Sequence, residues 1–149
     1  MASTRQGEEP MRISSRTEYG ILAMVDLAEH AGLGPIGSHE IAERQDVPEP
    51  YLNQILTLLR KAGLIGSRRG PGGGHALARA AIEITLADIV AALEGPLWIA
   101  ESTATSDGRD LRLSDIWGEV DSAIYAILQR ITLADLVERS RRKAYSYQI

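Results

Sequence analysis

The chain has 149 residues, contains no cysteine, and carries 20 acidic against 16 basic residues, for a formal net charge of −4. The lack of cysteine excludes disulfide bonds, thiol nucleophiles and thiolate metal sites. No run of about eighteen apolar residues is present that could cross a membrane as a helix, and the negative net charge argues against general affinity for polyanions. We therefore expect a cytoplasmic protein of one domain with an extension.

The first part of the chain shows the pattern of three helices. Residues 1–10 are polar and are expected to form a disordered lead. Apolar residues at helical spacing predict a first helix over residues 15–31. The positions expected on its buried face are Ile21, Met24, Val25 and Ala28. Ser38 is the expected N-cap of a short second helix that ends at Gln45, and Pro50 suits the first position of a third helix.

The segment SRRGPGGGHALA, residues 67–78, is the most informative of the chain. It follows an apolar helical run over residues 51–62, and two β-prone pieces, residues 64–68 and 75–77, flank its glycine-rich turn. A helix followed by a two-stranded ribbon is the layout of a winged helix, which places the helix in the major groove of DNA. Residues 57–79 contain no acidic residue and five basic ones, namely Arg60, Lys61, Arg68, Arg69 and Arg79. This local positive charge predicts a phosphate-binding surface.

The second half of the chain has a different character, because residues 81–138 hold eleven acidic and three basic residues and would be repelled by DNA. Thr85 and Asp88 resemble a capping box at the start of another helix, and residues 97–112 are expected to form a loop. A long helix is predicted from about residue 113 to 131, with a wide apolar stripe. The stripe consists of Leu113, Ile116, Trp117, Val120, Ile124, Ile127, Leu128 and Ile131. The second subunit of a homodimer is the simplest surface to cover it.

These elements divide the chain into four parts after the lead. Residues 11–96 form a winged helix-turn-helix DNA-binding domain, residues 97–112 the loop, residues 113–143 the dimerisation helices, and residues 144–149 a tail. The expected fold class is therefore mainly α with a small β-wing, a winged helix-turn-helix domain followed by a long C-terminal dimerisation helix.

Candidate DNA contacts lie in the third helix and the wing. Asn53 and Gln54 can bond bidentately to adenine, although they could also be merely solvated. Tyr51 fits a core position and a phosphate contact equally well. Arg69 can reach a narrow minor groove, and a solvated hairpin arginine is the alternative. The full set of expected DNA contacts is Ser14, Pro50, Tyr51, Asn53, Gln54, Arg60, Arg68, Arg69, Gly72 and Gly73.

No arrangement of residues points to catalysis, a metal site or a cofactor. The three histidines, His30, His39 and His75, are dispersed without ligand spacing and are expected at the surface. The glycines of the wing precede a strand and are not followed by a Gly-Lys-Ser/Thr sequence, which excludes the usual phosphate loops of nucleotide-binding proteins. We therefore expect no catalytic residue, no metal and no cofactor.

Several segments taken together resemble the BadM/Rrf family of bacterial winged-helix transcription regulators. They are MRISSRTEYGILAMVDLA at 11–28, IAE at 41–43, YLNQIL through LRKAGL at 51–64, RGPGGG at 69–74, and ITLAD with LEGP within 84–96. The resemblance covers nearly everything from residue 11 to about 137. It implies a homodimeric regulator that binds double-stranded DNA.

The resemblance also has implications for sensing. Many family members hold an iron–sulfur cluster on three cysteines in the segment between the position of Pro96 and the long helix. In this chain that segment, residues 97–115, contains neither cysteine nor histidine. The chain therefore resembles the cluster-free, CymR-like branch that regulates cysteine metabolism. Members of that branch end in an aromatic-rich tail that closes with isoleucine. The similarity implies that Tyr145, Tyr147 and Ile149 bind cysteine synthase, whose active site accepts a C-terminal isoleucine.

The function expected from these features is a DNA-binding repressor without a cluster. Two alternatives stay open at this point. The same scaffold could sense a small-molecule effector near the dimer helix, or the winged helix could be a protein-interaction module that does not bind DNA. A steep fall of affinity with salt would separate DNA binding from the protein-interaction alternative.

Overall fold

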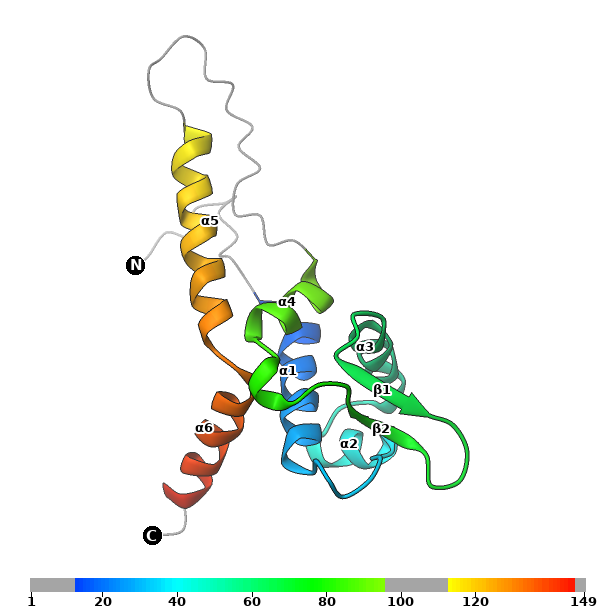
Figure 1. Cartoon of the computed structure of the whole chain (residues 1–149). Helices are drawn as coiled ribbons and strands as arrows, with labels where there is room; N and C mark the ends of the chain where they lie inside the picture. Colours follow the sequence, from blue (N-terminus) through cyan, green and yellow to red (C-terminus); the bar gives the residue numbers. More distant parts are fainter. Residues whose placement is uncertain (1–12, 96–112, 147–149) are drawn as a thin grey trace, which may run out of the picture.

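The computed structural model describes residues 13–95 and 113–146 (Figure 1). Its elements in chain order are α1 (Ser15–Glu29), α2 (Ser38–Gln45), α3 (Glu49–Lys61), β1 (Ile65–Arg68), β2 (Gly74–Leu77), the 3-10 helix η1 (Ala81–Glu83), α4 (Leu86–Glu94), α5 (Leu113–Arg130) and α6 (Leu133–Ser146). The fold is mainly helical with a two-stranded antiparallel wing, which confirms the predicted class. None of the helices in these two ranges combines the length and apolar character that a membrane crossing requires.

The hydrophobic core lies among α1, α2, α3 and α4, beside the base of the wing. Its most deeply buried large side chains are Met24, Leu27, Ile41, Leu52, Ile55, Leu56, Leu59, Leu64, Ile84, Ile89 and Leu133. The Leu93 side chain of α4 packs directly onto Gly20 of α1, where a Cβ atom would collide with it. Leu93 therefore occupies the space that a side chain at position 20 would need.

The buried face of α1 differs from the predicted one. Of the four predicted positions only Met24 is fully buried, and the deepest positions of this helix also include Ala23 and Leu27. The other three predicted residues are half-buried and pack against the edge of the core. The spacing of apolar residues did not predict the full buried face because α1 contacts α3, α4 and α6 at once. The helix therefore buries a wider face than one apolar stripe. The helix also ends at Glu29, two residues earlier than predicted.

A buried ion pair fixes α2 on α1. Asp26 is 2% exposed, and Arg44 donates to its two carboxylate oxygens from Nε at 2.9 Å and from an η nitrogen at 2.8 Å. Gln45 adds a third hydrogen bond at 3.0 Å. Burial alone would raise the pKa of Asp26, but the hydrogen bonds from Arg44 and Gln45 outweigh it and hold this pKa below its ordinary value. The end of α2 is therefore anchored by a charge that stays ionised.

Two similar helix starts lie side by side and join the two halves of the fold. At the start of α4, Thr85 and Asp88 form the predicted capping box. Thr132 and Asp135 repeat this arrangement at the start of α6, with hydrogen bonds of 2.9 and 3.1 Å. The two starts are connected by backbone hydrogen bonds on either side of the Thr85–Thr132 bridge. The Leu86 N–H donates to the Ile131 carbonyl at 2.7 Å, and the Leu133 N–H donates to the Ile84 carbonyl at 2.8 Å. Helix α6 is thereby held against the winged domain.

The C-terminal helices have nearly the predicted bounds, with one correction. Helix α6 continues to Ser146, so residues 144–146, which were expected in the tail, belong to a helix instead. The expected lead 1–10, the expected loop 97–112 and the tail residues Tyr147 and Ile149 lie outside the described residues. Figure 1 shows the first part of α5 projecting beyond the winged domain, and α6 continuing downward from the end of α5 beside α1.

Candidate nucleic-acid interface

Helices α2 and α3 form the helix-turn-helix unit. The turn between them contains Asp46, whose φ of 52° is left-handed, and Val47, which is buried and donates its backbone N–H to the Ala42 carbonyl at 3.0 Å. Asparagine and aspartate are the non-glycine residues that tolerate this conformation best. The turn thereby redirects the chain sharply into α3.

The start of α2 is tied to the start of α3. The predicted N-cap was wrong, because Gly37 caps α2 and Ser38 is its first residue. The Ser38 hydroxyl instead donates to the Glu49 carboxylate at 3.1 Å, and a His39 ring nitrogen lies 3.2 Å from the same carboxylate. Pro50 is the second residue of α3 rather than the first, after Pro48 as N-cap. The hydrogen bond from Ser38 connects the start of α2 to the start of α3.

Helix α3 has one buried and one exposed face. The buried side chains are Leu52, Ile55, Leu56 and Leu59. Pro50, Asn53 and Gln54 are exposed together on the opposite side, as a DNA-contacting helix requires. Thr57 continues this row and was missed by the sequence analysis. Its hydroxyl donates to the Asn53 carbonyl at 2.8 Å, a bond within one turn of the helix that the sequence does not announce.

Tyr51 and Ser14 take part in packing and capping. The Tyr51 ring meets the Tyr19 ring edge-on, with centroids 5.9 Å apart and planes at 87°, and its hydroxyl lies 3.4 Å from the Ser15 hydroxyl. Ser14 is the N-cap of α1, and its hydroxyl donates to the Glu94 carboxylate at 2.5 Å. The fold thus uses the Ser14 side chain internally, which gives no support to its predicted contact with DNA.

Glu94 is the centre of a small polar cluster at the start of α1. Besides the bonds from the Ser14 side chain and backbone, it accepts a bond of 2.6 Å from the hydroxyl of Thr17, which is fully buried. These hydrogen bonds, led by the one from the Ser14 side chain, hold the pKa of Glu94 below its ordinary value. The cluster connects the end of α4 to the beginning of α1.

The tip of the wing is a tight turn that requires glycine. The Gly73 backbone donates to the Gly70 carbonyl at 2.9 Å, with Pro71 and Gly72 in between. The φ of 74° at Gly72 is what the third residue of a type II turn needs. A Cβ on Gly73 would collide with the backbone of Arg68. The turn therefore leaves only a thin backbone at the tip and places the arginines at its base.

The wing carries positive charge that the fold does not neutralise. Arg60 and Lys61 at the end of α3, and Arg68 and Arg69 in the wing, are all exposed. Within residues 13–95 and 113–146, no acidic side chain forms an ion pair with any of these four. Arg79 differs, because it lies 3.8 Å from Asp88. Four cations are thus available for phosphate groups beside the exposed face of α3.

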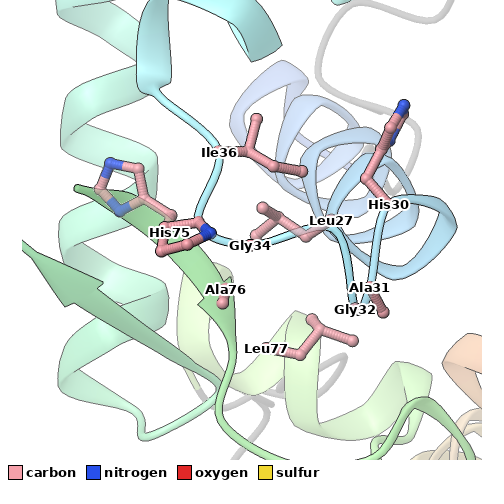
Figure 2. A pocket seen from close by; sticks show the side chains of 10 residues that line it. Leu27, His30, Ala31, Gly32, Gly34, Ile36, His75, Ala76 and Leu77 are labelled. Atoms are coloured by element: carbon pink, nitrogen blue, oxygen red, sulfur yellow. The ribbon is translucent and has the colours of Figure 1, made fainter. Parts of the chain in front are cut away.

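A small cavity lies behind the wing. The Ile36 backbone pairs with His75 of β2 through hydrogen bonds of 2.9 and 2.7 Å, which attaches the wing to the segment between α1 and α2. Beside this bridge is a mostly apolar cavity of about 260 Å³ (Figure 2). It is lined by Leu27, His30, Ala31, Gly32, Gly34, Pro35, Ile36, His75, Ala76 and Leu77.

The three histidines do not share one environment. His39 is at the surface as predicted, with 78% of its side chain exposed, whereas His30 and His75 are half-buried. Burial, together with the charge of Arg60, holds the pKa of His75 below its ordinary value. In the part of the chain that the structure describes, no three histidine, aspartate or glutamate side chains are gathered so as to hold a metal ion.

Helix α5 presents a large apolar surface. Leu113, Ile116, Trp117 and Ile127 are 38–49% exposed. The remaining predicted interface positions, Val120, Ile124 and Leu128, are half-buried. Tyr125, 54% exposed, lies beside the stripe and was not predicted. These side chains lie on the face of α5 for which a partner chain was predicted, and large exposed apolar surfaces are typical of interaction sites.

Three comparisons with known proteins agree with this geometry. A family model described as Rrf2, iron-dependent transcriptional regulator, matches residues 13–139. The chain is 35% identical over 130 residues to the HTH-type transcriptional regulator IscR of Photobacterium profundum, covering 85% of this chain and 76% of that protein.

Solved structures show the same fold. The structure of CymR, titled the global cysteine regulator of B. subtilis, is similar with a TM-score of 0.75 and 32% identity, covering 87% of this chain and 98% of that one. The IscR structure from T. potens has a TM-score of 0.69 and 38% identity over 87% of this chain and 88% of the other.

Proposed function

Because the chain belongs to the Rrf2 family of HTH-type transcriptional regulators, we propose that it is a homodimeric repressor that contacts its operator with α3 and the wing. The observation that carries this proposal is the exposed row of Pro50, Asn53 and Gln54 on α3, together with four basic side chains at the end of α3 and in the wing that form no ion pair with an acidic side chain of the described residues. An apolar or acidic surface would have favoured a protein partner. This surface is polar where bases would lie and cationic where phosphates would lie.

The dimensions of α3 fit the proposed docking. Its thirteen residues span about 20 Å, and the major groove is about 12 Å wide. Asn53 and Gln54 lie in the N-terminal half of the helix, from which a recognition helix contacts base edges. The amide of Gln54 can bond to adenine N6 and N7, whereas Arg69 at the base of the wing suits an adjacent minor groove. The glycine turn lets the wing backbone approach the DNA backbone closely.

The second subunit would cover the apolar stripe of α5. A symmetric pair of α5 helices would bury the stripes against each other and would present two copies of α3 to two half-sites of a palindromic operator. The acidic character of this half of the chain keeps α5 away from the DNA.

The proposed regulator works without an iron–sulfur cluster. The family description refers to iron, but this chain contains no cysteine, and the segment in which relatives hold the cluster also lacks histidine. Protein purified without oxygen is therefore expected to be colourless and to bind DNA in the absence of iron. A visible cluster absorbance with stoichiometric iron would contradict this.

The regulated pathway proposed here is cysteine metabolism, through the partner enzyme cysteine synthase. The similarity to a cysteine regulator supports this proposal, as do the aromatic side chains of Tyr145 and Tyr147 and the apolar side chain of Ile149, which suit a closed enzyme pocket. In calorimetry, deletion of Ile149 should abolish binding to the synthase and leave DNA affinity unchanged. Equal binding by the deleted form would refute the tail as the contact.

The experiment that tests the proposal is selection of duplexes from random DNA followed by fluorescence anisotropy. Gln54→Ala should cost about 1–3 kcal/mol on the selected site and relax the preference at one position. Affinity should fall about 10³-fold between about 50 and 200 mM salt if the dimer makes six or more phosphate contacts. Failure to enrich any sequence, together with weak salt dependence, would favour a protein-interaction module instead.

A further inference from the structure

The inner face of the wing brings a serine and a histidine together beside α3. Ser67 of β1 and His75 of β2 are direct cross-strand partners, and their side chains are joined by a hydrogen bond of 2.7 Å between Oγ and Nδ1. Ser67 is two residues from the buried Ile65, so the pair lies on the face of the wing that turns toward the domain. In Figure 2 the His75 ring points away from Leu27 and Leu77, which line the cavity on the other side.

The third member of this cluster is Arg60, near the end of α3. Helix α3, which contains Arg60, packs against β1, the strand that pairs with β2 at His75. The positive charge of Arg60 is also one of the causes that hold the pKa of His75 below its ordinary value. Arg60 is exposed and has no acidic partner in the described ranges. A guanidinium and an imidazole N–H can both donate hydrogen bonds to the same anion.

The hydrogen bond with Ser67 determines what His75 can offer to such an anion. In the neutral ring, a hydroxyl that donates to Nδ1 places the proton on Nε2. Nε2–H is then a donor, and the Arg60 guanidinium supplies further donors in a planar fork that suits phosphate oxygens. The three residues come from α3 and from the two strands of the wing, which are the elements that the proposed docking brings to the DNA.

We propose that Arg60, Ser67 and His75 form a binding site for one phosphodiester group of the DNA backbone, in the angle between α3 and the wing. This inference rests on the DNA-binding function proposed above. Arg60 and His75 contact the phosphate oxygens, and Ser67 acts as a positioning residue that holds the imidazole with Nε2 directed outward.

Occupation of this site couples DNA binding to proton uptake. A phosphate beside the ring favours the imidazolium and reverses the effect of Arg60, so the pKa of His75 is higher in the complex than in the free protein. The extra affinity is fully present below the pKa of the free protein and is lost as pH rises through the pKa of the complex. The neighbouring elements contribute Arg60 from α3, uncharged Ser67 from β1, backbone groups at Ile36, and His30 from the end of α1.

The test is operator affinity at pH 6 and pH 8, measured by anisotropy with a duplex selected by the wild-type protein. Wild type should bind about three- to tenfold more tightly at pH 6, since a pKa change of about one unit corresponds to tenfold. His75→Gln keeps an N–H donor near the position of Nε2 but does not titrate. Its affinity should therefore be independent of pH and within about twofold of wild type at pH 8. His39→Gln is the matched control, because His39 lies near the start of α3 beside Glu49; it should keep the wild-type pH ratio.

A chemical probe of the DNA identifies the phosphate itself. Single methylphosphonate substitutions, which remove one backbone charge each, should include one position that weakens wild type about tenfold but weakens Arg60→Ala and His75→Ala less than twofold. The site is refuted if the ratio of affinities at pH 6 and pH 8 persists in His75→Gln or disappears in His39→Gln. It is also refuted if every methylphosphonate substitution weakens Arg60→Ala and His75→Ala as much as it weakens wild type. If wild type selects no duplex at all, the failure belongs to the proposed function.

Discussion

Replacing Asp26 by Asn tests whether the buried ion pair holds the helix-turn-helix unit in place. The substitution preserves the volume of the side chain but removes the charge that accepts two hydrogen bonds from Arg44 and one from Gln45. Breaking a fully buried pair costs about 3–5 kcal/mol, because the remaining charge is left without a partner. Here Arg44 is 36% exposed and regains part of its hydration. We therefore expect a loss of about 2–3 kcal/mol in the free energy of unfolding.

Urea denaturation followed by circular dichroism measures this loss at equal protein concentrations. With a slope of about 1–1.5 kcal/mol per molar urea, the midpoint should fall by roughly 2 M. Glu138→Gln is the control, since Glu138 lies 2.6 Å from Arg142 in an exposed pair on α6. An exposed pair one helical turn apart contributes less than about 0.5 kcal/mol. The two substitutions remove the same type of charge from a buried and an exposed pair.

The pH dependence provides a second measurement of the same interaction. Because the folded-state pKa of Asp26 is depressed, its stabilising effect is present above the unfolded pKa of about 3.9 and is lost as pH falls through the folded pKa. The difference between wild type and Asp26→Asn should therefore be constant from pH 8 to 5 and shrink below about pH 4. A difference under about 0.5 kcal/mol at pH 7, or one that grows in acid, would refute the reasoning.

Three further predictions concern the packing, the dimer and the wing. Gly20→Val should lower stability by about 1–3 kcal/mol in thermal unfolding through its collision with Leu93, and an unchanged midpoint would contradict the close packing of α1 on α4. Ile124→Asp should convert a dimer into monomer or aggregate in light scattering, whereas Ala126→Asp on the opposite side of α5 should not; a monomeric wild type at micromolar concentration would remove the idea. Arg69→Ala should weaken operator binding most at A-rich flanks, and equal losses on random DNA would refute a shape-specific contact.

Features encoded over a few residues could be predicted from the sequence. The start of α4 was predicted from Thr85 and the acidic residue three positions later, because a capping box is formed within one helical turn. The wing was predicted from its glycines, and Gly73 shows the physical reason, since any side chain there would meet the backbone of Arg68. Asn53 and Gln54 were predicted in the first turns of the third helix, and the structure leaves both of them exposed there.

Features that depend on distant residues could not be predicted. No local pattern around Ser14 indicated that Glu94, eighty positions away, would accept a hydrogen bond from its hydroxyl. The pairing of Asp26 with Arg44 requires the angle between α1 and α2, which a short motif does not specify. His75 was expected at the surface, because one histidine in a strand gives no sign of its partner across the ribbon. In each case the side chain is compatible with several roles, and tertiary packing selects one.

The most direct test of docking through α3 and the wing is cleavage of operator DNA by an iron chelate attached to one residue of the protein at a time. Since the chain contains no cysteine, Gln54→Cys, Arg69→Cys and the control Glu138→Cys each provide one attachment point for an iron chelate that cuts nearby DNA. The account predicts cuts within each half-site from position 54, cuts at the flanks from position 69, and none from position 138 on α6. Cleavage from position 138, or protection of the operator without cleavage from position 54, would contradict docking through α3 and the wing.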